Sequence, residues 1–150
     1  MVDRYPLGLS RERAELYGKP HIGATYTSGG RYRHTADWCP ICGRPAGSVH
    51  HIARKSWAVE VPLVTDKGAW TLRSPLVTLC GNGTIGCHGR FHNGGLVMSW
   101  EWYRPSYEDL WWDGSLLAEH GPHSPALYRY GCWVILDTET HSELRIRRDR

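Results

Sequence analysis

Four of the five cysteines in this chain stand in two pairs whose spacing suits a metal ion. Cys39 and Cys42 enclose two residues, and Gly43 behind them frees the turn, so both sulfurs can reach one ion. Cys80 and Cys87 enclose six residues, three of them glycines, which lets that loop fold back on itself. Four thiolates complete a tetrahedral Zn²⁺ site, and a site closed in this way is structural. We therefore predict one structural Zn²⁺ held by Cys39, Cys42, Cys80 and Cys87.

A redox pair or a chance spacing is the alternative for Cys39 and Cys42. The second pair, which lies beside several histidines, favours zinc instead. The fifth cysteine, Cys132, stands between Gly131 and Trp133 and has the surroundings of a buried strand residue. We do not expect it to bind the ion.

Four of the nine histidines lie between the two cysteine pairs or just after the second pair. His88 follows Cys87 directly, and His92 comes four residues later, so on a helix the two share one face and can bind one ion. His50 and His51 are adjacent, and at a strand end they point to opposite faces and are expected to do different work. The alternatives are a histidine pair that caps a strand or binds the zinc, a His88 with no second ion, and a His92 on the surface.

The order of these motifs resembles that of the zinc-containing HNH endonucleases. The resemblance consists of Cys-x2-Cys, then His50-His51-Ile52, then Leu79-Cys80 and Cys87-His88, over about residues 38–93. The loop Leu-Cys-Gly-Asn-Gly-Thr-Ile-Gly-Cys-His-Gly-Arg-Phe-His is similar to the version common in bacteriophage proteins. The resemblance implies an α+β fold with a small ββα-metal, treble-clef-like core around the four-cysteine zinc site, flanked by short strands and helices. It also implies an enzyme that hydrolyses DNA phosphodiester bonds.

The resemblance assigns a role to each histidine. His51 matches the general base that activates water, while His50 and His88 match ligands of a catalytic divalent ion, Mg²⁺, Mn²⁺ or Ni²⁺. His92 matches a further ligand or a phosphate contact. The chemistry is consistent, because a divalent ion polarises the phosphate and a neutral imidazole with a pKa of about 6.5 accepts a proton from water at neutral pH.

One position departs from the family pattern. The family's middle Asn, which holds the backbone around the general base, is replaced by Pro75. Asn82 and Asn93 are nearby, but neither occupies the family position. We expect this change to lower the cleavage rate without abolishing the site.

Basic residues follow the histidine motifs and predict a DNA partner. Arg54 and Lys55 come directly after His51-Ile52-Ala53 and should flank the scissile phosphate, and Arg90 lies between His88 and His92. We predict salt-sensitive, sequence-independent phosphate contacts for Arg54, Lys55 and Arg90. A solvated charge pattern is the alternative. The arginines at 145, 147, 148 and 150 fit either a second phosphate contact or a frayed tail.

The elements that must position these residues divide the chain into three parts: an N-terminal arm (1–36), the HNH core with its zinc site (37–95), and a Trp-rich extension packed on the core (96–150). Eight tryptophans against one phenylalanine indicate that tryptophan fills the core, with base stacking or a protein partner as the alternative. Residues 21–34 are expected to form a loop. Helices are expected at 11–17 and 107–117, and strands at 58–64, 70–72, 133–136 and 143–147.

Composition limits the class of protein. The 150 residues carry a net charge of only +3, too little to show a polyanion partner by itself. We expect no membrane segment and a cytoplasmic protein (in the host cytoplasm if a bacteriophage encodes it), with the oligomeric state left open. The alternative function is a catalytically degenerate zinc-knuckle accessory protein of a bacteriophage that binds nucleic acid or protein. Pro75 favours this alternative, and the set His50, His51 and His88 favours the nuclease.

Overall fold

Short strands and shorter helices make up a computed structural model that describes residues 9–29, 31–54 and 56–149. The helices are α1 (Arg11–Ala14), α2 (Gly86–His92), α3 (Pro105–Trp112), α4 (Ser115–His120) and the 3₁₀ helix η2 (Pro125–Arg129). The strands are β1 (Ala24–Tyr26), β2 (Tyr32–His34), β3 (Ser48–His51), β4 (Glu60–Thr65), β5 (Gly68–Arg73), β6 (Leu76–Leu79), β7 (Leu96–Trp102), β8 (Gly131–Asp137) and β9 (Glu143–Ile146). The protein is therefore a small mixed α/β structure, and within its described part no helix has the length and apolarity to cross a membrane.

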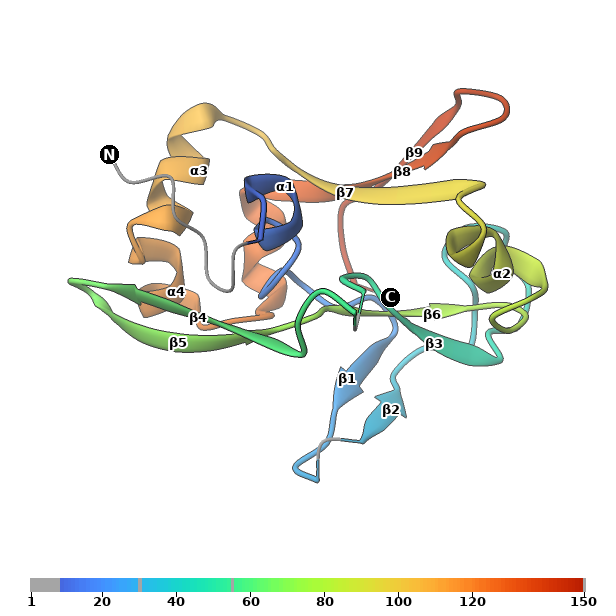
Figure 1. Cartoon of the computed structure of the whole chain (residues 1–150), viewed down its shortest axis with the longest axis horizontal. Coiled ribbons are helices and arrows are strands. Elements are labelled where there is room, and N and C mark those ends of the chain that lie inside the picture. The colour runs from blue at the N-terminus through green and yellow to red at the C-terminus, as the bar shows by residue number, and fades with distance from the viewer. Residues whose placement is uncertain (1–8, 30, 55, 150) are drawn as a thin grey trace.

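Among the described residues all the strand ladders are antiparallel, and they form four small sheets. The hairpin β4–β5 is inserted between β3 and β6, which pair with each other, and β7, β8 and β9 form the one three-stranded sheet. In Figure 1 the β7–β8–β9 sheet runs along one side of the molecule and the β3–β6 and β4–β5 ribbons along the other. Helix α2 lies at one end, with α3 and α4 at the opposite end, while the β1–β2 hairpin projects outward (Figure 1).

Tryptophan fills much of the core, as the composition predicted. Trp111 and Trp133 are fully buried and Trp100 nearly so, and the Trp133 indole N–H donates to the Pro20 carbonyl over 2.9 Å. Trp38, beside the first cysteine pair, is the exception, with 56 % of its surface exposed. Leu16, Tyr17 and Ile22 belong to the same core cluster, so this stretch of the N-terminal part packs into the body of the protein.

A buried lysine lies among these tryptophans. Lys19 is fully buried, and its Nζ lies 3.6 Å from the centroid of the Trp111 ring and donates to the Glu15 carbonyl over 2.8 Å. Burial lowers the pKa of Lys19 to about 7. The Trp102 indole N–H donates to the carboxylate of Glu15. These contacts join α1 to the Trp-rich part of the chain.

The sequence predictions of elements were correct in part. The strands expected at 58–64, 70–72, 133–136 and 143–147 are confirmed as β4, β5, β8 and β9. The expectation of a loop at 21–34 is wrong, because β1 and β2 form a hairpin there. The helix expected at 107–117 is broken into α3 and α4 at Gly114, whose φ of +89° and contact with the Thr65 hydroxyl leave no room for a side chain.

Candidate metal centres

The four cysteines of the two pairs converge on one point. The Sγ atoms of Cys39, Cys42, Cys80 and Cys87 all lie within 4.8 Å of one another, and those of Cys42 and Cys80 are 3.4 Å apart without a disulfide. Zn–S bonds of about 2.3 Å in a tetrahedron place sulfurs about 3.8 Å apart. These four residues therefore could hold a metal ion such as zinc.

Backbone geometry explains why the two pairs can meet. The Gly43 N–H donates to the Cys39 carbonyl over 2.9 Å, which closes the first turn. In the second loop, Gly86 has a φ of +67°, and a Cβ there would lie 2.7 Å from the Cys80 carbonyl oxygen. Only glycine fits this close approach, so the glycine-rich loop is what brings Cys80 and Cys87 close together.

The ionisation of these thiols also suits a cation. Burial and the neighbouring Cys39 raise the pKa of Cys87. Burial opposes the Cys80 thiolate too, but the Cys87 N–H and the neighbouring thiols outweigh it and lower the pKa of Cys80. Thiols this close together repel one another as anions, so a cation is needed to hold all four as thiolates. Cys132 lies fully buried in β8 opposite Glu101, as expected of a strand residue, and is outside this group.

Three histidines form a second candidate metal group. Nitrogen atoms of His50, His88 and His92 lie within 4.8 Å of one another, and the Nε2 atoms of His88 and His92 are 3.1 Å apart. Zn–N bonds of about 2.05 Å in a tetrahedron place nitrogens about 3.3 Å apart. The three imidazoles therefore fit one divalent ion.

The strand β3 and the helix α2 hold these histidines in place. Strand β3 pairs with β6, and α2 follows β6 after the glycine-rich loop. His88 and His92 are one helical turn apart, and the His50 ring stacks on Phe91 from the same helix at 5.1 Å between centroids. Burial, reinforced by the neighbouring imidazoles, lowers the pKa of His50 to about 3, and burial likewise lowers the pKa of His88. Neutral imidazoles are the form that binds metal.

His51 has different surroundings from its neighbour His50. Its ring meets Tyr32 of the β1–β2 hairpin edge-on at 5.0 Å, and it is outside the three-histidine group. Both residues nevertheless line the same groove of about 750 Å³. This groove lies between β3, α2 and β7 and contains His50, His51, Arg54, Trp57, His88 and His92. A group bound at the histidines could therefore be reached from His51.

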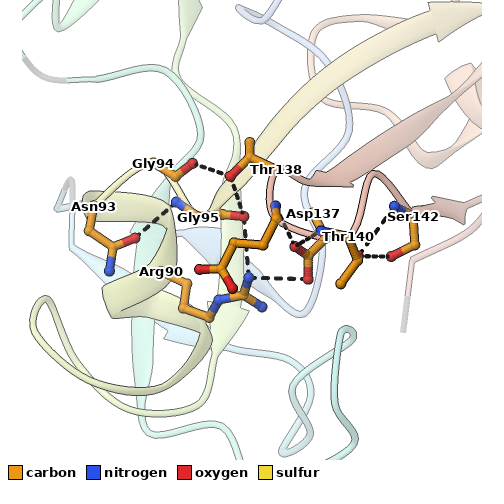
Figure 2. Close-up of polar contacts among 9 residues, drawn as sticks. Arg90, Asn93, Gly94, Gly95, Asp137, Thr138, Thr140 and Ser142 are labelled. Atoms are coloured by element: carbon orange, nitrogen blue, oxygen red, sulfur yellow. Dashed lines mark hydrogen bonds and ion pairs between the residues drawn. The ribbon is translucent and has the colours of Figure 1, made fainter.

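The basic residues expected to bind DNA differ in their surroundings. Arg54 is exposed and lines the groove. Arg90 reaches from α2 to Asp137 at the end of β8, with 3.1 Å between Nη2 and the carboxylate, and donates to the Gly95 carbonyl over 3.3 Å (Figure 2). Arg90 thus ties α2 to the β7–β8 sheet, and its DNA contact stays a prediction. Lys55 lies outside the described residues.

A serine lies next to the position of the family's middle Asn. The Ser74 hydroxyl accepts from the Ala53 N–H over 2.8 Å and donates to the Ala53 carbonyl over 2.9 Å, two residues after His51. Asn82 instead accepts from Thr84 within its own loop, and Asn93 accepts from Gly95 (Figure 2). Sequence reasoning missed Ser74, whose only signal was a small polar residue beside Pro75.

Two further histidines, outside both candidate metal groups, pack against each other. His21 and His123 stack with 4.2 Å between ring centroids, and His21 Nδ1 accepts from the Leu76 N–H over 2.9 Å. Burial lowers the pKa of His21 to about 3 and that of His123 to about 4. His21 bonds to β6, while His123 Nδ1 lies 2.9 Å from the Lys19 carbonyl, so the stacked pair links β6 to the segment before β1.

Comparisons with protein-family models, curated proteins and solved structures find no match for this chain. The function of the site is therefore inferred from the chemistry of its own residues.

Proposed function

We propose that this chain is a metal-dependent endonuclease of the HNH type that hydrolyses DNA phosphodiester bonds. The observation that carries the proposal is the three-histidine group of His50, His88 and His92, which shares one groove with His51. A protein that used only its four cysteines to bind zinc would have no need for a second group of ligands. The antiparallel β3–β6 pair followed by α2 supports the proposal, because it matches the order of elements in a ββα-metal core.

Each histidine has a distinct task in this proposal. His50, His88 and His92 hold a divalent ion, which supplies polarisation of the scissile phosphate and charge stabilisation of the leaving oxygen. His51, on the other face of β3, takes the proton from the attacking water as general base. Tyr32 limits the directions that the His51 ring can take, and Arg54 on the same groove attracts the phosphate backbone.

The ligand set favours some ions over others. Among the described residues the group contains three imidazoles and no carboxylate. Imidazole suits Ni²⁺ and Zn²⁺, whereas Mg²⁺ prefers oxygen ligands. We therefore expect Ni²⁺ or Zn²⁺ to support activity better than Mg²⁺, with Mn²⁺ in between.

A supercoiled plasmid tests the proposal. Zinc-loaded protein is incubated with the plasmid and Ni²⁺, Zn²⁺, Mn²⁺ or Mg²⁺, and nicked and linear products are measured on a gel. We expect the protein to cleave the plasmid and EDTA to stop the cleavage. Elemental analysis should show that the structural zinc stays bound under the same conditions. The double variant His88→Ala/His92→Ala is the control for contaminating nuclease and should not cut.

The second candidate function is a degenerate zinc-knuckle module that binds nucleic acid or protein. Pro75 in the position of the family Asn favours it, as does the net charge of only +3. Plasmid that is bound but left intact with all four ions would establish this second function and overturn the first.

A further inference from the structure

The hydroxyl of Ser48 joins the two candidate metal centres. Ser48 is the first residue of β3, two residues before His50, and its Oγ lies 2.7 Å from Nδ1 of His88. The same Oγ donates to the carbonyl of Gly81 over 2.9 Å and lies 3.3 Å from the carbonyl of Leu79. Gly81 directly follows Cys80, so the hydroxyl lies between the cysteine loop and the histidine group.

The number of protons fixes the direction of these hydrogen bonds. A serine hydroxyl has one proton, and carbonyl oxygens can only accept. If Ser48 gave its proton to His88, the Gly81 and Leu79 carbonyls would face oxygen lone pairs with no proton between them. The proton therefore goes to Gly81, and His88 Nδ1–H donates to Ser48 Oγ. This leaves the Nε2 lone pair of His88 facing His92, 3.1 Å away.

We infer that Ser48 is a positioning residue that fixes the tautomer and orientation of His88 for metal binding, and that the cysteine loop in turn holds Ser48 through Gly81. The inference rests on the proposed function only in its use of the histidine group as a metal site. Ligand histidines in proteins generally donate their second N–H to a neighbouring acceptor, and loss of that acceptor weakens metal binding roughly 10–100-fold. Ser48 supplies that acceptor here and connects it to the structural site.

Two measurements test the inference independently of DNA cleavage: the affinity of the histidine group for Ni²⁺ and the tautomer of His88. Ni²⁺ affinity is measured by calorimetry on zinc-loaded protein, with His88→Ala giving the background at other sites. Ser48→Ala should bind Ni²⁺ roughly 10–100-fold more weakly, and Ser48→Thr, which keeps the hydroxyl, should bind much as the wild type does. Ser99→Ala, an exposed serine of β7, is the matched control and should change nothing.

Imidazole ¹⁵N shifts of the Ni²⁺-free protein give the second readout. They should show His88 with its proton on Nδ1 in the wild type and a mixture of tautomers in Ser48→Ala. An Nε2–H tautomer in the wild type, or equal Ni²⁺ affinity in Ser48→Ala and wild type, would overturn the inference. A protein that binds Ni²⁺ in this Ser48-dependent way yet leaves plasmid intact would refute only the nuclease proposal.

Discussion

At the scale of single residues, adjacent side chains in β3 have separate environments because a strand alternates its faces. His50 packs on Phe91 beside His88 and His92, whereas His51 contacts Tyr32 from the projecting hairpin. One residue can therefore bind an ion while the next binds water. The division of work that we propose for His50 and His51 rests on this local geometry.

The exposed guanidinium of Arg54 gives a residue-scale prediction about DNA binding. Arg54→Ala should weaken binding of all DNA sequences alike and flatten the dependence of log K on log salt by about one unit, because one phosphate contact is lost. Binding titrations between low and moderate salt measure this slope. Arg104→Ala, an exposed arginine at the start of α3 at the opposite end of the molecule, should leave the slope unchanged. A change of sequence preference at constant slope would contradict the contact.

At the scale of elements, the candidate zinc site lies where β6, the glycine-rich loop and α2 meet, and a bound ion would hold this segment together. The helix α2 has only seven residues, too few to be stable alone, and its N-cap residue Ile85 makes no side-chain capping bond. Cys87 lies within α2 and Cys80 just before the loop that leads to it, so an ion bound by the four cysteines would anchor the start of the helix. Arg90 anchors the other end of α2 to Asp137.

Removal of one cysteine should therefore release this segment. In Cys39→Ser we expect zinc content to fall from one ion per chain toward none and amide exchange in residues 80–92 to speed up, because zinc binding energy on the order of 10 kcal/mol supports the fold. Elemental analysis and hydrogen exchange measure both. Cys132→Ser, which alters a buried cysteine outside the site, should keep its zinc. Unchanged zinc content in Cys39→Ser would refute the assignment.

Contacts between residues that are close in sequence could be predicted, whereas contacts between distant residues could not. The pair His88 and His92 follows from helical spacing, and the four-cysteine group follows from the two pairs and their glycines. Ser48 and Ser74 could not be found in this way, because they hydrogen-bond to residues 40 and 21 positions away and a lone serine has no spacing signal. The break at Gly114 likewise depends on its contact with Thr65, which helix periodicity does not reveal.

At the scale of the whole molecule, one buried core includes residues from near the start of the described chain to β9. The stacked pair of His21 and His123 joins the segment before β1 to the segment between α4 and η2. Their pKa values are lowered to about 3 and about 4, while in the unfolded chain a histidine titrates at about 6.5. Below that value the unfolded state binds more protons than the folded state, so acidification favours unfolding.

Above pH 6.5 these two histidines should therefore have no effect on how the free energy of unfolding varies with pH. As the pH drops from 6.5 toward 4, they should make the free energy of unfolding fall. Urea unfolding at pH 7.5 and at pH 4.5 measures the loss. His123→Asn should lose less stability than the wild type over this range, by on the order of 1–2 kcal/mol, because one titrating group is gone. His141→Asn, at an exposed residue with the same positive φ, should show the wild-type pH dependence. An equal pH dependence in His123→Asn and wild type would contradict the account.

We propose His51 as the general base beside an ion that His50, His88 and His92 would hold. Single-turnover cleavage of supercoiled plasmid by His51→Ala at saturating Ni²⁺ tests it most directly. The account predicts a rate about 10²–10⁴-fold below that of the wild type, with zinc content, Ni²⁺ affinity and DNA binding unchanged. Cleavage by His51→Ala at the wild-type rate would contradict it.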